Sequence, residues 1–271
     1  WYGPAMNTHR SPFAGRNFEY YSEDGVLAGK LAANVVSGAA DKGLYAYIKH
    51  FALNDQETFR TEALCTWADE QTIREIYLKP FEIVVKEAKT TIDYISDENG
   101  THSQKEMNAC TAVMSSFNRI GTTWSGGNKA LMTDVLRGEW GFRGFAISDF
   151  NLYEYMNTDQ GMRAGTDMQL TWLASETMPF GRPNYSDTKS GTARQAIRTA
   201  YHNVFYTIAN SSAMQGVAPG TIITYKPSGW RVAFWILDAV LGTFLVCGTA
   251  WVVYRTFKFN SKPKSEESTQ N

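Results

Sequence analysis

Residues 144–150 suggest chemistry most plainly, because a short apolar run carries a carboxylate where it ends. The run is typical of a buried strand, and Asp149 follows its last apolar residues. In a parallel α/β barrel the strand ends that face the active site carry the catalytic groups, so Asp149 is placed to act on a substrate. The alternative is that Asp149 caps a following helix, which is the better interpretation of such a run standing alone.

Four other blocks upstream favour the catalytic interpretation. Together with residues 148–150 they resemble, in order and spacing, the catalytic barrel of glycoside hydrolase family 3, the β-glucosidase family. The resemblance covers residues 1 to about 210 and is specific because five separate blocks agree. Residues 52–55 lack the Pro-Gly-His pattern of the family's N-acetylglucosaminidase branch, which favours the glucosidase or xylosidase branch. The four upstream blocks are residues 15–24, 49–57, 115–119 and 136–142.

The resemblance implies that Asp149 is the nucleophile of a retaining glycosidase. Such an enzyme needs one carboxylate that attacks the anomeric carbon and a second group that protonates the leaving oxygen. In the family the acid/base glutamate usually lies in a separate α/β sandwich domain, and we expect it outside these 271 residues. We also expect the first barrel strands, with a sugar-binding aspartate, outside the chain. The 271 residues alone are therefore predicted neither to close a barrel nor to hydrolyse natural glycosides.

Lys49 and His50 end the second predicted strand, and the resemblance implies that they bind hydroxyls of the sugar next to the scissile bond. An ammonium and an imidazole both bind hydroxyls, and a nearby cation favours an ionised nucleophile. A Lys-His pair alone is usually an ordinary polar strand end, so the neighbouring residues carry the assignment. Residues 54–57 and Arg60 are expected to form a buried hydrogen-bonded support below the site.

Two further positions are candidate substrate-binding residues. Arg16 matches a family arginine that contacts the same sugar, and its alternative role is a salt bridge to Glu19 or Glu23. Phe117 stands where many members have a tyrosine whose hydroxyl reaches the nucleophile. Phenylalanine keeps the ring and removes that hydrogen bond, which is expected to raise the pKa of Asp149 and slow glycosylation.

The segments that must position these residues alternate between strand-like and helix-like patterns, as in βα units. We therefore predict an α/β fold, a partial (β/α)8 TIM-type barrel over residues 1–212. Five strands are too few to close such a barrel, and the resemblance implies the last five βα units. A polar insertion at 96–107 is predicted to be a surface loop. The predicted strands are residues 1–6, 45–49, 112–115, 145–148 and 168–170, and the predicted helices are residues 26–37, 70–87, 129–138 and 192–208.

The composition argues against several classes of partner and cofactor. A formal net charge of −1 gives no reason to expect nucleic acid or another polyanion. Cys65, Cys110 and Cys247 lack metal-binding spacing, and unpaired buried thiols at Cys65 and Cys110 are favoured over a bridge between them. Two carboxylates suffice for glycoside hydrolysis with retention, so we expect neither a metal ion nor an organic cofactor.

Residues 232–254 form a run of 23 residues with one charge, Asp238. As a helix the run is about 34 Å long, which is enough to cross a bilayer core. The alternative is a buried core helix, but the run follows the last expected barrel helix. More Lys and Arg follow the run than precede it, so the positive-inside rule places the tail in the cytoplasm. We predict a linker at 213–229, a transmembrane helix at 230–255 and a polar cytoplasmic tail at 256–271.

Together these features predict a membrane-anchored, retaining, exo-acting β-glycosidase whose catalytic domain lies outside the cell. The expected substrates are short oligosaccharides or glycosides with a terminal β-linked sugar, most simply glucose. The alternative is a non-catalytic carbohydrate-binding or surface-display protein built on a degenerate barrel. Phe117 favours that alternative, whereas the presence of Arg16, Lys49, His50 and Asp149 opposes it.

Overall fold

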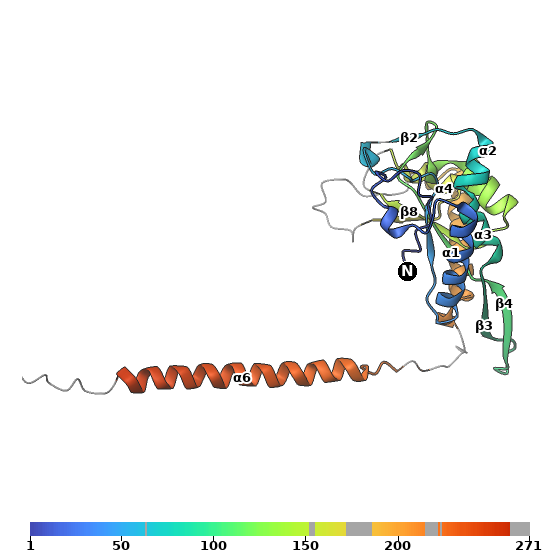
Figure 1. The fold of residues 1–271 in the computed structure, drawn as a ribbon. Coiled ribbons are helices and arrows are strands. Elements are labelled where there is room, and N and C mark those ends of the chain that lie inside the picture. Colours follow the sequence, from blue (N-terminus) through green and yellow to red (C-terminus); the bar gives the residue numbers. More distant parts are fainter. Residues whose placement is uncertain (63, 152–154, 172–185, 215–221, 223, 261–271) are drawn as a thin grey trace, which may run out of the picture. The chain divides into compact units, whose positions relative to one another are not determined.

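A parallel sheet with strand order β1-β5-β8-β9 lies at the centre of the first of two units (Figure 1). The computed structural model describes residues 1–62, 64–151, 155–171, 186–214, 222 and 224–260. The two units are Trp1–Pro219 and Gly220–Asn271. The strands are β1 (Tyr47–Phe51), β5 (Ala112–Ser115), β8 (Phe145–Phe150) and β9 (Met168–Leu170), and every neighbouring pair is parallel.

The middle strands of the sheet are buried on both faces. All four residues of β5 and the first five of β8 are buried. Continuous apolar runs of this kind are typical of parallel strands that are covered by helices on one face and by other strands' side chains on the other. The register places Val113 opposite Ala146 and Met114 opposite Ile147. Asp149 therefore belongs to a strand that packing fixes along its whole length.

Gly144, immediately before β8, allows the closest approach between β8 and the neighbouring segment. A Cβ atom at this position would lie 1.9 Å from the carbonyl oxygen of Thr111, so no side chain fits. The next residue, Phe145, donates its backbone N–H to that oxygen at 3.2 Å. The start of β8 is thus pinned to the segment that enters β5.

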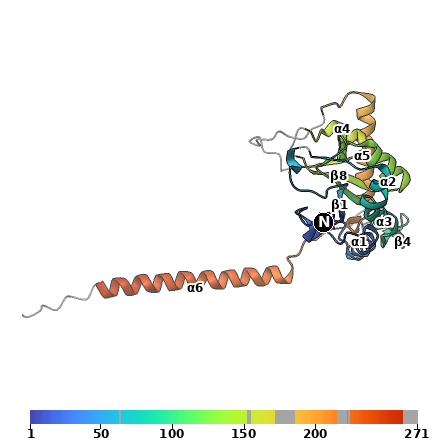
Figure 2. The ribbon, with the colours of Figure 1, turned by 45° about the horizontal axis from the view of Figure 1, so that its top comes forward.

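Helices α1 (Gly25–Ala40) and α3 (Lys79–Glu87) pack against one another beside the sheet (Figures 1 and 2). Asp24 caps α1, because its side chain accepts hydrogen bonds from the first backbone N–H groups of the helix. Small residues bring the two axes together: a Cβ at Gly29 would lie 2.8 Å from Ile83. The helix predicted at 70–87 is present in three parts, α2 (Glu70–Thr72), the π-helical η3 (Ile73–Tyr77) and α3.

The other helices of this unit follow β5 and β8. They are the π-helical η5 (Ala130–Glu139), α4 (Thr158–Ala164) and α5 (Gly191–Ala209). Thr207 of α5 donates its hydroxyl to the Thr111 carbonyl at 3.0 Å and so ties the helix to the sheet. The short elements are η1 (Asn17–Glu19), η2 (Arg60–Glu62), β2 (Cys65–Thr66), β6 (Arg119–Ile120), β7 (Thr123–Trp124), η4 (Ser125–Gly127) and η6 (Ser212–Met214).

The prediction of a surface loop at 96–107 is wrong. The region forms an antiparallel hairpin of β3 (Lys89–Ile95) and β4 (His102–Asn108), paired over seven residue pairs. Alternate residues of β3, Thr90 and Ile92, are buried, so the hairpin keeps one face against the domain. The carboxylate of Asp97 accepts hydrogen bonds from two backbone N–H groups and closes the turn.

Two smaller expectations also differ from the structure. Residues 1–6 form a β-bridge between Ala5 and Lys49 rather than a strand, although backbone hydrogen bonds join Trp1, Pro4 and Met6 to β1. Of the two thiols expected to be buried, only Cys110 is, and burial raises its pKa to about 12. Cys65 is exposed.

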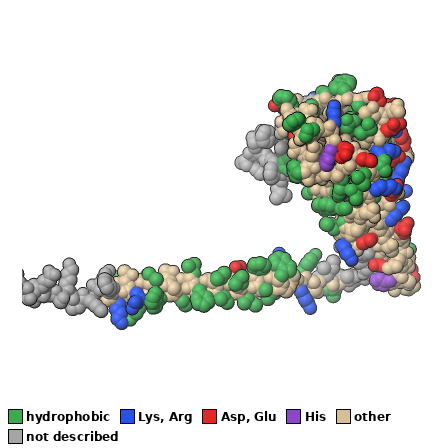
Figure 3. Space-filling view, viewed as in Figure 1, with side chains coloured by type: hydrophobic (Ala, Val, Ile, Leu, Met, Phe, Trp, Pro, Cys, Tyr) green, Lys and Arg blue, Asp and Glu red, His purple; other side chains and the backbone are tan. Residues whose placement is uncertain are grey.

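The second unit contains one long helix, α6 (Gly229–Asn260). An 18-residue stretch within residues 229–258 has a mean hydropathy of 1.9, and the helix is long and apolar enough to cross a membrane by length and composition. Hydrophobic side chains cover the helix and basic side chains gather at its two ends (Figure 3). Residues 215–221 and 223 of the predicted linker lie outside the described residues, as do residues 261–271 of the predicted tail, whose residues 256–260 belong to α6.

Candidate active site

The predicted site residues meet at the carboxyl ends of three neighbouring strands. His50 lies in β1, Phe117 follows β5 by two residues, and Asp149 is the fifth residue of β8. Because the carboxyl ends of parallel strands share one edge of the sheet, residues far apart in sequence come together there. His50 Nε2 lies 3.8 Å from Asp149 Oδ2.

The carboxylate of Asp149 is buried and only half satisfied. Its side chain is 10% exposed. Oδ1 accepts the backbone N–H of Phe150 at 2.7 Å, whereas Oδ2 accepts no hydrogen bond from the described residues. Burial raises the pKa of Asp149, and the Phe150 N–H and three nearby cations oppose that rise. The helix-capping role is taken by another residue, since Asn157 caps α4.

The imidazole of His50 is held neutral beside this carboxylate. Burial lowers the pKa of His50 well below its ordinary value, and Arg16, Lys49 and Arg60 lower it further. The backbone of His50 is fixed on both sides by Asn7, whose side chain accepts its N–H and donates to its carbonyl, each at 2.9 Å. A neutral imidazole offers one N–H donor and one acceptor nitrogen.

Arg16 and Lys49 both pair with the same acidic residue. Arg16 forms an ion pair with Glu19 and a second one with Glu57, 3.5 Å from Nη1 to Oε1. Lys49 Nζ lies 3.5 Å from Glu19 Oε2. The salt bridge predicted as the alternative role of Arg16 is therefore present, with Glu19 as the partner. Arg16 and Lys49 thus lie within one connected group of charged side chains, and the neutral His50 lies beside Asp149.

Arg60 is a member of the site that the sequence did not place there. It was expected in the supporting layer, but its Nη2 lies 3.7 Å from Asp149 Oδ2. Its Nη1 donates to Glu57 Oε2 at 2.6 Å. The only sequence signal for it is the spacing of Glu57 and Arg60, because an acid and a base three residues apart can pair on one turn.

Phe117 forms part of the floor of the site. It is 3% exposed and packs in a small apolar cluster with Trp124 and Met156. The loop around it is tied to the end of β1, because Ser116 and Asn118 both donate side-chain hydrogen bonds to the carbonyl of Ala52, at 3.0 and 3.1 Å. These bonds fix the distance between the strand ends that carry His50 and Phe117.

Of the residues expected in the supporting layer, Asn54 and Asp55 are buried. Asn54 accepts the Tyr20 hydroxyl at its carbonyl, 3.0 Å away. Asp55 Oδ1 accepts the Thr8 hydroxyl at 3.3 Å. Burial raises the pKa of Asp55 to about 6, against the opposing effects of Thr8 and Arg10. Among the described residues, no group of three or more His, Cys, Asp or Glu side chains is arranged to hold a metal ion.

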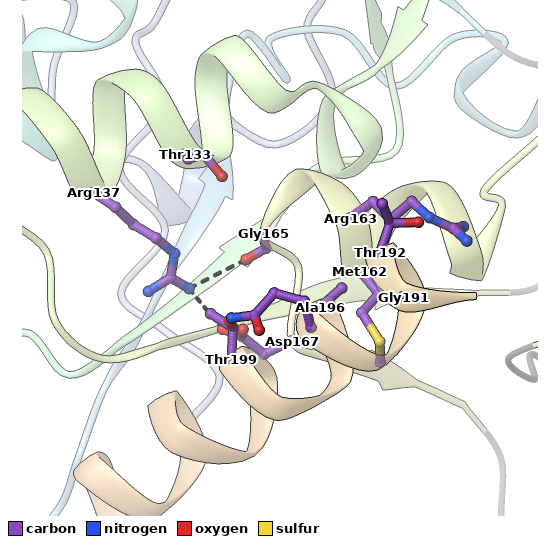
Figure 4. Close-up of a pocket in the computed structure, with 11 residues that line it drawn as sticks. Thr133, Arg137, Met162, Arg163, Gly165, Asp167, Gly191, Thr192, Ala196 and Thr199 are labelled. Atoms are coloured by element: carbon purple, nitrogen blue, oxygen red, sulfur yellow. Dashed lines mark hydrogen bonds and ion pairs between the residues drawn. The ribbon is translucent and has the colours of Figure 1, made fainter. Parts of the chain in front are cut away.

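A separate hollow of about 560 Å³ lies between η5, α4 and α5 (Figure 4). Its charged residues bind one another: Arg137 donates to Asp167 Oδ2 at 2.6 Å and to the Gly165 carbonyl at 3.2 Å. Asp167 also accepts the backbone N–H of Ala146 at 2.8 Å and the side chain of Asn203 at 2.9 Å. None of the predicted site residues lines this hollow.

The sequence is similar to a known protein family and to several of its members. The model described as "Glycosyl hydrolase family 3 N terminal domain" matches residues 1–180. The chain is 40% identical over 169 residues to the probable beta-glucosidase I of Aspergillus clavatus, which covers 62% of this chain and 17% of that protein. It is 43% identical over 150 residues to beta-glucosidase A of Butyrivibrio fibrisolvens, which covers 55% and 16%.

Comparison with solved structures also finds similarity to a beta-glucosidase. Beta-glucosidase 3B from Thermotoga neapolitana, in complex with glucose, aligns with a TM-score of 0.60 and 31% sequence identity. That alignment covers 79% of this chain and 27% of the Thermotoga chain. The chain therefore spans less than a third of the length of each of these three relatives.

Proposed function

The chain belongs to glycosyl hydrolase family 3, and from this membership we propose that it carries the nucleophile and the sugar-binding residues of a retaining β-glycosidase. It is a β-glucosidase-like glycoside hydrolase domain. We propose an exo-acting enzyme that removes a terminal β-linked sugar, most simply glucose, from the non-reducing end of an oligosaccharide or glycoside. A β-xyloside is the nearest alternative substrate.

The observation that carries this proposal is the state of Asp149. Its Oδ2 is buried, accepts no hydrogen bond from the described residues, and has His50 and Arg60 within 4 Å. In the proposed reaction Oδ2 attacks the anomeric carbon while the bond to the leaving oxygen breaks and that oxygen takes a proton. A water molecule then cleaves the glycosyl ester, which restores Asp149 and retains the anomeric configuration.

We assign the sugar hydroxyls to the groups around Asp149. Neutral His50 can donate to one hydroxyl and accept from another. Arg16 and Lys49, on either side of Glu19, are assigned to hydroxyls farther from the anomeric carbon. Phe117 is assigned no direct contact with the sugar, because its ring is 3% exposed and lies under the Arg60 guanidinium.

The proton donor is proposed to lie outside this group of residues. Glu19 is paired with Arg16 and Lys49, and Glu57 with Arg16 and Arg60. Both carboxylates are thus committed to cations that hold the site together. We therefore expect natural glycosides to need an acid from elsewhere, whereas a leaving group that departs without protonation should not need it.

The test is covalent labelling of the full chain with 2,4-dinitrophenyl 2-deoxy-2-fluoro-β-D-glucoside. Its leaving group departs without protonation, and the fluorine slows hydrolysis of the glycosyl ester, so the intermediate accumulates. We expect one glucosyl adduct, on the peptide that contains Asp149. An adduct on another carboxylate would refute the assignment.

A non-catalytic carbohydrate-binding protein is the second candidate, and the phenylalanine at position 117 favours it. Without a tyrosine hydroxyl here, Asp149 Oδ2 has one fewer donor to stabilise it. The same experiment separates the candidates, because a binding protein would be protected by glucose against heat but would acquire no adduct.

We further propose that α6 anchors the domain in a membrane, with the domain outside the cell and the tail inside. The support is the length and hydropathy of residues 229–258 and the basic residues that follow them. Protease added to intact cells should remove the domain and spare a tag placed after Asn271. Cleavage of the tag with the domain intact would reverse the orientation.

A further inference from the structure

The guanidinium of Arg60 contacts three parts of the site at once. Its Nη2 lies 3.7 Å from Asp149 Oδ2, and its Nη1 donates to Glu57 Oε2 at 2.6 Å. Its Cζ lies 4.1 Å from the centroid of the Phe117 ring. A guanidinium suits this position because its flat face can stack on a ring while its N–H edge faces carboxylates.

These contacts restrict where the charge of Arg60 can lie. Phe117 is almost fully buried against Trp124 and Met156, so the ring is a fixed surface. Glu57 holds one edge of the guanidinium by a short hydrogen bond, and the other edge then faces Asp149. The side chain of Arg60 is 23% exposed, so water screens its charge only in part.

We propose that Arg60 is a positioning residue that keeps Asp149 ionised and in place for attack, with Phe117 as the surface that orients its guanidinium. The proposal rests on the function proposed above for Asp149. At 3.7 Å the contact is an ion pair rather than a hydrogen bond, so the charge stabilises Oδ2 while leaving its lone pairs available. The charge of Arg60, held on the ring of Phe117, thereby stabilises the ionised carboxylate of Asp149, as the hydrogen bond of a tyrosine hydroxyl at position 117 would.

The electrostatics agree with this geometry. Burial raises the pKa of Asp149, and among the cations that oppose the rise Arg60 acts most strongly, ahead of Arg16 and Lys49. Removing the charge of Arg60 should therefore leave the carboxylate protonated at a higher pH. A purely structural arginine would have no such effect on the titration of Asp149.

The experiment compares the full chain with its Arg60→Gln and Arg60→Lys variants. The first measurement is the rate of labelling by the dinitrophenyl 2-fluoroglucoside from about pH 4 to 8, where the acid limb reports the ionisation of Asp149. The second is the carboxyl ¹³C titration of Asp149 by NMR, assigned by the loss of its signal in Asp149→Asn. Arg163→Gln is the matched control, because it also removes one arginine charge but pairs with Asp187.

We expect Arg60→Gln to move the acid limb and the NMR titration to higher pH by about one unit, with labelling at a pH below both midpoints reduced roughly tenfold. Arg60→Lys should give a smaller shift in the same direction, since an ammonium cannot stack on Phe117 while bonding Glu57 and facing Asp149. Adding Phe117→Tyr to Arg60→Gln should move the limb back toward lower pH. Arg163→Gln should leave the limb unchanged.

A rate that falls equally at every pH, with the limb and the NMR titration unmoved, would overturn the proposal. If Arg60→Gln does not fold, the Arg60→Lys variant tests the proposal instead. An acid limb of its pH–rate profile identical to that of the wild type would also overturn the proposal. The two measurements also separate this inference from the proposed function. A wild-type chain that is never labelled at Asp149 refutes the function, whereas the NMR titration still tests Arg60.

Discussion

Asp149 and Asp167 are two buried aspartates at the same sheet, each close to an arginine, yet their surroundings differ. Burial raises the pKa of both. Asp167 accepts three hydrogen bonds, from Arg137, the backbone of Ala146 and Asn203, and its side chain is 3% exposed. Asp149 accepts one described hydrogen bond, and its nearest guanidinium nitrogen is 3.7 Å away.

The difference separates a carboxylate that stabilises the fold from one that is available for chemistry. A buried charge is tolerated when hydrogen bonds and a counter-ion replace its hydration, as they do around Asp167. Around Asp149 these interactions replace only part of the lost hydration, so the packing of other residues must offset the cost of burying its charge. An unsatisfied acceptor of this kind is what a nucleophile needs.

The same isosteric substitution at the two positions should therefore have opposite effects. Asp149→Asn should reduce the rate of labelling by the dinitrophenyl 2-fluoroglucoside by at least about 10³-fold, because an amide cannot attack the anomeric carbon. The thermal unfolding midpoint should stay the same or rise, because a neutral amide is buried in place of a charge. A large loss of stability with labelling retained would reverse the comparison.

Asp167→Asn should destabilise the fold by about 3–5 kcal/mol, because it leaves the buried guanidinium of Arg137 without its counter-ion. Chemical denaturation of the two chains measures this difference. Asp187→Asn is the matched control: its ion pair with Arg163 is about a third exposed, and its loss should change stability far less than the loss at Asp167. Equal effects at Asp167 and Asp187 would show that burial does not decide the outcome.

Asp55 is a third buried aspartate, and its titration should make the free energy of unfolding depend on pH. Its pKa is about 6 in the folded chain against an ordinary value of 3.8, so the folded state binds a proton more tightly than the unfolded state. Its contribution to stability is therefore fully present below about pH 4 and is lost as the pH rises to about 6. The loss is up to about 3 kcal/mol.

Asp55→Asn should remove this pH dependence, because an amide does not titrate and its oxygen can still accept the Thr8 hydroxyl. Denaturation curves of both chains at pH 4 and pH 7 measure the difference. The variant should gain stability relative to the wild type at pH 7 and not at pH 4. Parallel curves at both pH values would contradict the assignment of Asp55.

An effect smaller than that at Asp149 itself is expected at the residues around it. His50→Ala and Lys49→Ala should each lower kcat/KM for 2,4-dinitrophenyl β-D-glucoside, whose leaving group needs no proton donor, by about 10²-fold, which corresponds to about 2.7 kcal/mol, if their bonds strengthen in the transition state. The backbone bonds of His50 to Asn7 remain in the alanine variant, so the position of β1 should not change. A loss below threefold would assign the pair to support of the site.

Much of this arrangement follows from local patterns in the sequence. The apolar runs of β5 and β8 and the helical segments predicted the parallel sheet and its covering helices. The same patterns placed Lys49, His50 and Asp149 at strand ends, whereas their proposed roles came from the resemblance to the family. The hairpin of β3 and β4 was missed because its strands are mostly polar and only Thr90 and Ile92 mark the buried face. Polar strands lack the alternation on which the prediction depends.

Arg60 was missed for a different reason. Its contact with Asp149 joins residues 89 positions apart and depends on how the loop after β1 folds over the carboxyl end of β8. No periodicity in the sequence reports such a contact. The pairing of Arg16 with Glu19 was foreseen because it is local, whereas the pairing of Lys49 with Glu19 depends on the tertiary fold.

The close approach of Gly144 to Thr111 fixes the register of β8, and therefore the position of each residue that follows along the strand. With Gly144 locked against Thr111, successive side chains from position 145 to 147 leave opposite faces of the sheet, and the register with β9 then shifts between Ile147 and Phe150. One residue inserted between Gly144 and Asp149 would keep every residue type of the site and would turn the carboxylate toward the opposite face. Descendants of this sequence can therefore change the residues of this interval far more freely than its length.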